Sequence, residues 1–313
     1  MRKFPISLHF LTATAVIFAI QVIPGVGYLL FHFALIWSVP LINAGMIGTV
    51  IEALAQRVSR KWLVLPVAFY GGYYAFALTE HLALSKLSSS YAAANDQVTI
   101  PFNPERHALV FTDDGDDGSW LTQNYGLPVA YTRNANFPEG HSSRRIMPSD
   151  VCVIVSENPA LNVAQIKPLG FSDVGANGSR NRDWRFCALD MPERPVLPVV
   201  VVSRKKEQIR QGTLLVTRIT TTVTMPTGKR YTLLSGVAAP LSSFPMPIME
   251  CVPEDCNPQF WRDGFTPVLP GNAPFSHDSI VIAKSLGLKR VAPADRRGGD
   301  ETLVREKIAE GLR

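Results

Sequence analysis

The N-terminal 84 residues are so poor in charge that they constrain the fold more than any other feature of the chain. They contain five basic and two acidic residues, far below the roughly 25% charged content of an ordinary soluble domain. The rest of the 313-residue chain carries the other 26 basic and 24 acidic residues. This contrast predicts a membrane domain over residues 1–84, followed by a polar domain with little net charge.

Three apolar segments of this region are long enough to cross a bilayer. They cover about residues 6–23, 28–51 and 62–82, and the breaker PGVG and the basic loop QRVSRK separate them. A helix of 18 residues is about 27 Å long, close to the roughly 30 Å of a hydrocarbon core. The sequence therefore predicts a three-helix transmembrane anchor. A cleaved signal peptide is the alternative for the first segment, but no small-x-small cleavage site precedes PGVG.

The basic residues of the membrane domain predict its orientation. With three spans, Arg2 and Lys3 lie on the same side as Arg57, Arg60 and Lys61, whereas the PGVG turn carries no charge. The positive-inside rule places this basic side in the cytoplasm. We therefore expect the C-terminal domain to be extracytoplasmic, and periplasmic if the anchor lies in a bacterial inner membrane.

The cysteines support an exported domain independently. All four lie in the part of the chain placed outside, and an even number of thiols in an exported domain favours disulfides. The spacing of CVPEDC predicts a Cys251–Cys256 disulfide, which leaves Cys152 with Cys187. The latter two lie in strand-like runs and could be neighbours in a sheet. A four-thiolate zinc site is the alternative, although no C-x-x-C pair is present.

The C-terminal part predicts a β-rich α+β domain. Residues 85–97 indicate a polar connector, and 98–313 the globular domain. Runs of β-branched and aromatic residues predict strands at 107–111, 128–132, 151–156, 185–189 and 196–203.

A hairpin and two helices complete this domain. The segments TLLVTRITTTVTM and RYTLLSGVA flank the turn PTGK and predict a β-hairpin. Helical spacing follows at 277–288 and 300–312, so the helices are expected at the C-terminal end.

Motif searches leave two classes of function open. The sequence contains no G-x-S-x-G, H-E-x-x-H or P-loop motif, nor a G-x-G-x-x-G after a strand. This favours a membrane-anchored envelope protein whose exported domain is a binding or assembly module, with the lipid bilayer and another envelope protein as partners. The alternative is a membrane-tethered hydrolase or carbohydrate-processing enzyme that uses the Asp113–Asp117 carboxylates and a histidine, for which His141 is the best candidate.

Nucleic acid is excluded as a partner. The one dense basic cluster, SRKKEQIR at 203–210, has no interleaved aromatic residues and indicates a solvated loop or helix face.

The acidic stretch FTDDGDDGSW has a metal interpretation and a structural one. Clustered carboxylates and glycines outside the cytoplasm suit calcium, with Asp114 and Asp116 as ligands. Their spacing to Gly118 misses the EF-hand pattern, however, and Tyr125 stands where its bidentate glutamate would be. A solvated turn after an apolar strand is favoured.

Polar side chains near the expected outer face of the membrane are a further candidate site. His32 and the pair Glu80 and His81 lie at similar depth in the predicted spans. Polar groups in spans are costly and are often functional, so His32 and His81 are candidate ligands of a metal, a haem or a quinone. The favoured interpretation needs no cofactor and places these side chains in the headgroup zone.

Overall fold

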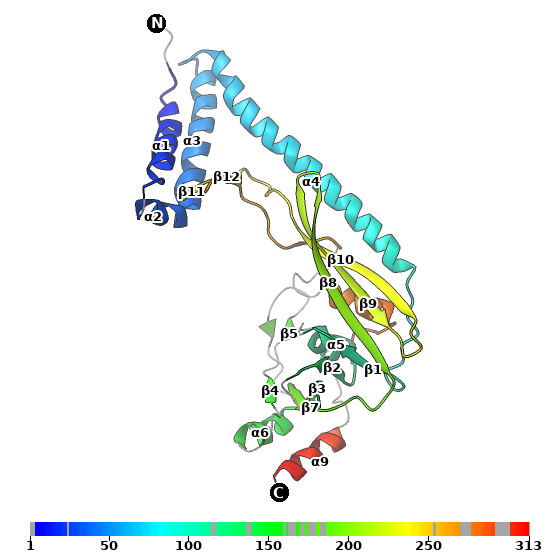
Figure 1. Cartoon of the computed structure of the whole chain (residues 1–313). Coiled ribbons are helices and arrows are strands. Elements are labelled where there is room, and N and C mark those ends of the chain that lie inside the picture. The colour runs from blue at the N-terminus through cyan, green and yellow to red at the C-terminus, as the bar shows by residue number, and fades with distance from the viewer. Residues whose placement is uncertain are drawn as a thin grey trace. The chain divides into compact units, whose positions relative to one another are not determined.

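The computed structural model divides the chain into two units (Figure 1). It describes residues 4–23, 25–113, 117–135, 139–158, 161, 167–169, 173–174, 180–181, 186–252, 255–269, 277–291 and 301–312. Unit 1 comprises Met1–Lys86, Arg210–Val216 and Ala238–Thr266. Unit 2 comprises Leu87–Ile209, Thr217–Val237 and Pro267–Arg313.

Unit 1 is built on apolar helices. They are α1 (Leu8–Ile20), α2 (Val26–His32), α3 (Ala34–Leu54), the short 3₁₀ helix η1 (Arg60–Leu63) and α4 (Val64–Asp96). By length and composition, α3 and the continuous η1–α4 segment could cross a membrane.

The prediction of three spanning helices is not confirmed. Helix α1 has 13 residues and is only about 20 Å long. It is short because the chain turns before Leu8 and again at 21–23, so the 18 apolar residues do not form one helix. The second predicted span is divided between α2 and α3 at Phe33, which leaves helical geometry.

Close packing holds α1 antiparallel to α3. The hydroxyls of Ser7 and Thr49 are 3.0 Å apart, and the carboxylate of Glu52 accepts the backbone N–H of Ser7 at 2.9 Å. A Cβ atom on Gly48 would lie 2.6 Å from the Cβ of Ser7, and one on Gly45 would also clash with α1. The small residues of α3 therefore allow the contact, and the start of α1 lies beside the end of α3.

Helix α4 continues through residues 85–96, where the sequence indicated a connector. The division between the units falls within it, after Lys86. In unit 2, Leu87 and Tyr91 are buried. Asn95 accepts the backbone N–H of Leu234 at 2.8 Å and donates to its carbonyl oxygen at 2.7 Å. These contacts stabilise the last turns of a segment that is polar but rich in alanine.

Unit 2 contains most of a nine-stranded mixed sheet. Its order is β13-β10-β9-β8-β1-β2-β3-β7-β4. The longer strands are β1 (Ala108–Phe111), β2 (Ala130–Arg133), β3 (His141–Pro148), β7 (Phe186–Pro192), β8 (Val199–Gln211), β9 (Leu214–Thr224) and β10 (Arg230–Ala239). The short strands are β4 (Lys167–Leu169) and β13 (Thr266–Pro267), with β5 (Asp173–Val174) and β6 (Arg180–Asn181) in a separate pair.

The centre of this sheet is parallel. Strand β1 pairs in parallel with β2 and β8, and helix α5 (Asp117–Tyr125) connects β1 to β2. All four residues of β1 are buried, as expected for a parallel strand covered on both faces. Helix α8 (His277–Ser285) contributes Ile282 and Ala283 to the same core as Leu109 and Phe111. The predicted hairpin is confirmed as β9 and β10.

The predicted strand at 151–156 is wrong, because this run is part of helix α6 (Ser149–Glu157). Val151, Cys152 and Val155 are buried, which is the spacing of one helical face. They pack with Val304 and Ile308 of α9 (Glu301–Gly311). A short run of β-branched residues does not distinguish a strand from a buried helix by itself.

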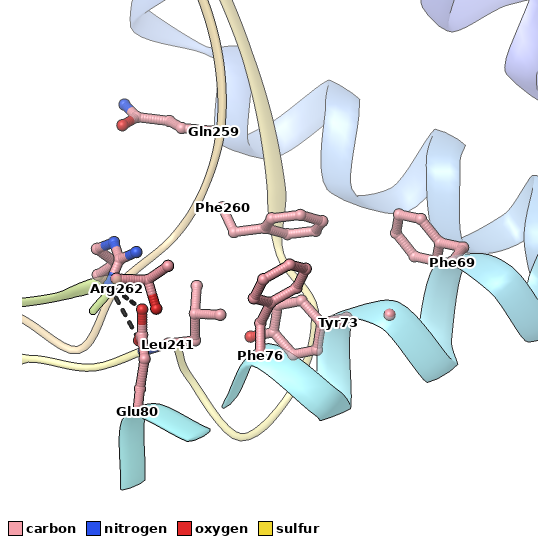
Figure 2. Close-up of a pocket in the computed structure, with 10 residues that line it drawn as sticks. Phe69, Tyr73, Phe76, Glu80, Leu241, Gln259, Phe260 and Arg262 are labelled. Atoms are coloured by element: carbon pink, nitrogen blue, oxygen red, sulfur yellow. Dashed lines mark hydrogen bonds and ion pairs between the residues drawn. The ribbon is translucent and has the colours of Figure 1, made fainter. Parts of the chain in front are cut away.

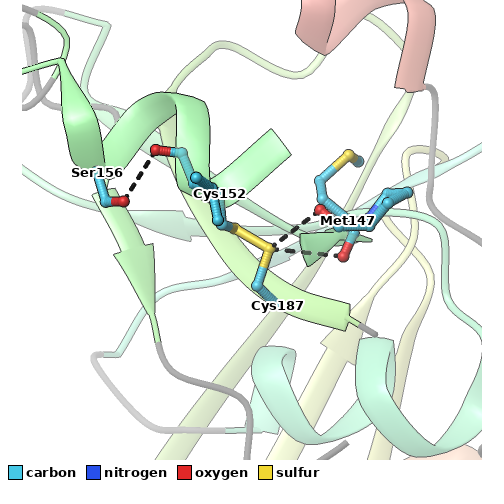
Figure 3. Close-up of a disulfide and its surroundings, with 6 residues drawn as sticks. Met147, Cys152, Ser156 and Cys187 are labelled. Carbon is cyan, nitrogen blue, oxygen red and sulfur yellow. Dashed lines mark hydrogen bonds between the residues drawn. A yellow bond between two sulfur atoms is a disulfide. The ribbon is translucent and has the colours of Figure 1, made fainter. Parts of the chain in front are cut away.

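The Cys152–Cys187 disulfide is present, and it joins helix α6 to strand β7 (Figure 3). Its Cα atoms are 6.4 Å apart, within the usual range of about 4.4–6.8 Å. The predicted pairing is therefore confirmed, although the two cysteines are not neighbours in a sheet.

The second predicted disulfide lies on the hairpin of β11 (Pro247–Val252) and β12 (Asp255–Phe260) in unit 1. The backbone register places Cys251 directly opposite Cys256. Their side chains lie outside the described part of the structure, so this disulfide stays a prediction.

The basic run at 203–210 is neither a loop nor a helix face. It continues strand β8, with most of its side chains exposed. The four central charged and polar residues face solvent, which fits the prediction of a solvated surface.

Candidate functional site: an apolar pocket in unit 1

A pocket of about 510 Å³ lies between α4 and the segment that contains β11 and β12 (Figure 2). Its volume is within the roughly 300–1,000 Å³ of ligand sites. It is lined by Phe69, Gly72, Tyr73, Phe76, Glu80, Thr213, Leu241, Gln259, Phe260 and Arg262. All of these residues belong to unit 1.

One face of α4 forms the floor of the pocket. Phe69, Tyr73, Phe76 and Glu80 follow one another at intervals of three or four residues, which places them on one side of a helix. Gly72 lies among them, and a Cβ atom there would meet no other atom within 4 Å. The absence of a side chain at Gly72 therefore leaves open space in the pocket, which a larger residue at this position would fill.

The ring of Phe260 faces these aromatic residues of α4 and completes an aromatic wall. The ring of Phe260 lies 4.8 Å from that of Tyr73 and 5.9 Å from that of Phe69, both in tilted arrangements. Figure 2 shows Phe260, Tyr73, Phe76 and Phe69 gathered at one end and the charged side chains at the other. The pocket is thus aromatic along most of its length and polar at one end.

The polar end is an ion pair between Glu80 and Arg262. Glu80 is only 1% exposed, and both of its carboxylate oxygens lie 3.0 Å from Nη1 of Arg262. The backbone N–H of Leu241 donates to the same carboxylate at 2.8 Å. Nη1 of Arg262 also donates to the carbonyl oxygen of Ala239 at 2.9 Å. Backbone groups therefore hold the pair on both sides.

Polar side chains of α3 and α4 bind the non-helical backbone that follows β10. Backbone carbonyl groups outside helices and sheets need such partners where they are buried. Each side chain donates to a carbonyl oxygen: Tyr73 to Ser242 at 2.7 Å, Ser38 to Pro247 at 2.8 Å and Asn43 to Pro245 at 3.1 Å. These residues fix the wall of the pocket against the helices.

This arrangement suits binding better than catalysis. The lining residues that the structure describes include no Cys, His or Ser, the hydroxyl of Tyr73 donates to the carbonyl oxygen of Ser242, and the two charged groups are engaged with each other and with the backbone. Nucleophilic or general acid–base chemistry needs such a group within reach of a substrate. An apolar cavity with a polar end is instead suited to an amphipathic ligand.

The predicted histidine ligands do not line this pocket. His32 and His81 are exposed, and Nδ1 of His32 lies 2.8 Å from the carbonyl oxygen of Tyr28. Within the described ranges there is no group of three His, Cys, Asp or Glu residues that could hold a metal ion. Glu80, which the sequence placed beside His81 without a role of its own, is the buried residue. A carboxylate within an apolar run was the sequence feature that could have identified Glu80 as a site residue.

Of the acidic stretch, the structure describes Asp113, which follows β1 in unit 2. Asp114 and Asp116 fall outside the described residues, so their calcium interpretation stays untested. Asp113, which precedes them, accepts a hydrogen bond from Nε of Arg204 at 2.5 Å. Arg204 follows the part of β8 that pairs with β1.

The sheet topology brings His141 to the same edge as Asp113. Phe111 is paired with Thr132, and the next residue, Arg133, is paired with His141. Two strand spacings, roughly 10 Å, separate β1 from β3. Asp113, two residues after β1, and His141 therefore lie at the carboxyl edge of the parallel strands, where ligands of α/β sheets commonly bind.

A buried ion pair lies near His141. The backbone N–H of Glu193 donates to the carbonyl oxygen of His141 at 3.3 Å, and its carboxylate lies 2.6 Å from Nη1 of Arg145. Burial opposes ionisation of Glu193, but the hydrogen bond and charge of Arg145, aided by Ser143 and Lys307, outweigh it and lower the pKa of this carboxyl. Glu193 is therefore bound to Arg145 and does not serve His141 as a base.

Comparisons with protein-family models, with curated proteins and with solved structures each found no match for the chain.

Proposed function

We propose that the protein is a membrane-anchored binding module of the cell envelope. Helices α3 and α4 anchor it in the bilayer, and the exported unit 2 meets other envelope components, including a protein partner. The pocket of unit 1 is its binding site. The proposal rests on one observation: the cavity is largely apolar, and its two charged side chains, Glu80 and Arg262, are bonded to each other.

The contacts of the N-terminus support the proposed orientation. The backbone N–H of Ile6 donates to Glu52 at 2.8 Å, and the ring of Phe4 lies 5.6 Å from that of Trp62. The start of the chain is therefore at the same end of unit 1 as the basic loop. The positive-inside rule favours a cytoplasmic location for this end. Unit 2 would then be extracytoplasmic, and periplasmic in a bacterium.

The length of α4 supports a position of Glu80 near the opposite membrane surface. From Lys61 to Glu80 the chain advances by 19 residues, or about 28 Å of helix, which is close to the roughly 30 Å hydrocarbon core. The charged end of the pocket would lie at the outer headgroups, and the aromatic part in the hydrocarbon.

Photocrosslinking in native membranes tests the binding function. A photoreactive benzoyl-phenylalanine at position 76 lines the pocket, and one at Leu78 is the matched control on the same helix. The two native side chains are similarly exposed, at 58% and 60%. We expect an adduct at position 76 that Gly72→Leu abolishes and that does not form at position 78. The same adducts at both positions, unaffected by Gly72→Leu, would contradict the proposal.

A membrane-tethered hydrolase is the second candidate, because Asp113 and His141 lie at one edge of the sheet. The test is turnover by the full-length protein of ester, phosphoester and glycoside substrates. Turnover that is lost in both Asp114→Asn and His141→Ala would favour the enzyme over the binding module. Turnover that both variants retain would remove the two residues from consideration.

A further inference from the structure

We propose that the pocket of unit 1 holds one phospholipid of the outer leaflet. Its acyl chain lies against the aromatic wall, and its phosphate binds Arg262. This inference rests on the proposed membrane-anchored binding function and names the chemical class of the ligand.

The pocket has the length and polarity of one leaflet. From Phe69 to Glu80 the chain advances by 11 residues, or about 16 Å of helix, and half of a hydrocarbon core is about 15 Å. The rings lie toward the bilayer centre and the ion pair toward the surface. A lipid in the outer leaflet has the same order of apolar and polar parts along the same direction.

Arg262 offers a free donor pair for a phosphate. In the part of the chain that the structure describes, its hydrogen bonds to Glu80 and Ala239 all leave from Nη1. The side chain is 34% exposed, and the edge formed by Nε and Nη2 is not used in these bonds. This edge is the fork with which arginine binds phosphate through two hydrogen bonds. Glu80 meanwhile fixes the guanidinium group in position.

The walls of the pocket favour a lipid over a peptide. An extended peptide in an apolar site needs partners for its backbone N–H and C=O groups. Half of the ten lining residues are aromatic or leucine, the hydroxyl of Tyr73 already donates to the carbonyl oxygen of Ser242, and Thr213 and Gln259 are the other neutral polar ones. An acyl chain has no polar group to satisfy. Phe76 lines the pocket and is largely exposed, so a chain can enter from the lipid phase.

The test uses the full-length protein in phosphatidylethanolamine vesicles that contain a small fraction of the same lipid with an acyl-chain diazirine. After irradiation, peptide mass spectrometry locates the adducts. We expect pocket labelling at Phe69, Tyr73 and Phe260. Labelling of the other faces of α4 measures contact with bulk lipid in the same sample.

Two leucine variants separate the pocket from the helix surface. A Cβ atom meets no neighbour within 4 Å at either Gly72 or Gly71, but only Gly72 lines the pocket. We expect Gly72→Leu to reduce pocket labelling at least ten-fold and Gly71→Leu to leave it within two-fold of the wild type. Equal pocket labelling in the two variants overturns the proposal.

A third variant tests the phosphate contact. Arg262→Lys keeps the charge beside Glu80 but removes the fork, so we expect about ten-fold weaker labelling by the phospholipid, as for the loss of a charge-assisted hydrogen bond. A diazirine-bearing diacylglycerol, which lacks the phosphate, should label this variant and the wild type equally. Unchanged phospholipid labelling of Arg262→Lys overturns the headgroup assignment.

The outcomes also separate this inference from the function on which it rests. A peptide adduct at position 76 that disappears in Gly72→Leu refutes the phospholipid and retains the binding module. If neither lipid nor protein gives a pocket-dependent adduct, both are refuted.

Discussion

Replacing Glu80 by glutamine tests whether the buried carboxylate holds the wall of the pocket. The amide has nearly the same shape, and its oxygen can still accept the N–H of Leu241. Its NH₂ group, however, puts donors in place of one of the two oxygens that now lie 3.0 Å from Nη1 of Arg262. The variant thus removes the ion pair with little change in volume.

The expected cost follows from the burial of the two partners. Breaking a fully buried pair costs about 3–5 kcal/mol, and a single hydrogen bond to a charged group contributes about 1.5–3 kcal/mol. Glu80 is buried but Arg262 is one-third exposed, so water can hydrate the guanidinium group that loses its partner. We therefore expect the free energy of unfolding to fall by about 2–3 kcal/mol, close to the range for a single hydrogen bond to a charged group.

Thermal unfolding of the detergent-solubilised protein measures this loss, with Trp261 beside Arg262 as a fluorescent reporter. At about 2–4 °C per kcal/mol for a domain of this size, Tm should fall by about 4–12 °C. His81→Ala, at an exposed neighbouring position, is the control and should leave Tm unchanged. In a double-mutant cycle, Glu80→Leu and Arg262→Met together should cost less than their sum. A Tm for Glu80→Gln equal to that of the control, with additive costs in the cycle, would refute the reasoning.

Three further predictions concern the disulfide, the buried carboxyl of unit 2 and the contact between α1 and α3. Non-reducing peptide mapping should recover Cys152 bonded to Cys187, and free thiols at these positions would contradict the disulfide. Replacing both cysteines by serine should lower the free energy of unfolding by about 4 kcal/mol, because the bond closes a loop of sequence separation 35. The folded-state pKa of Glu193 is lowered, so its stabilisation is fully present above its unfolded pKa of about 4.3 and is lost as the pH falls through the folded pKa. Glu193→Gln should therefore lower the free energy of unfolding at neutral pH. It should also weaken the fall of that free energy with decreasing pH, as measured by denaturant unfolding, and an unchanged pH dependence would contradict this role of Glu193. Gly48→Ala should destabilise the fold by about 1–3 kcal/mol through overpacking and so lower Tm. Gly71→Ala, with no neighbour within 4 Å, should leave Tm unchanged; equal effects would exclude the proposed steric contact.

Local patterns in the sequence were sufficient for several elements of the fold. Low charge and high apolar content marked the helices of unit 1, and the flanks of PTGK marked the hairpin of β9 and β10. The C-terminal helices also followed from residue spacing. These features depend on residues close together in the chain, so composition and periodicity reveal them. The same patterns predicted three spans, a number that the helix lengths do not confirm, because apolar content does not show where a helix ends.

Long-range contacts decided the rest. Val151 and Val155 form a helix because α9 and β7 cover one of its faces, and no local signal indicated that β1 pairs in parallel with both β2 and β8.

The candidate site depends on such contacts most strongly. Glu80 by itself is a carboxylate in an apolar run, and the sequence could mark it only as costly to bury. Its partners, Leu241 and Arg262, are 161 and 182 residues away along the chain. Only the tertiary structure brings them together, because the segment after β10 returns to α4 and its backbone must be satisfied there. The sequence therefore determined where apolar surface lies, and the fold decided which part of it encloses a pocket.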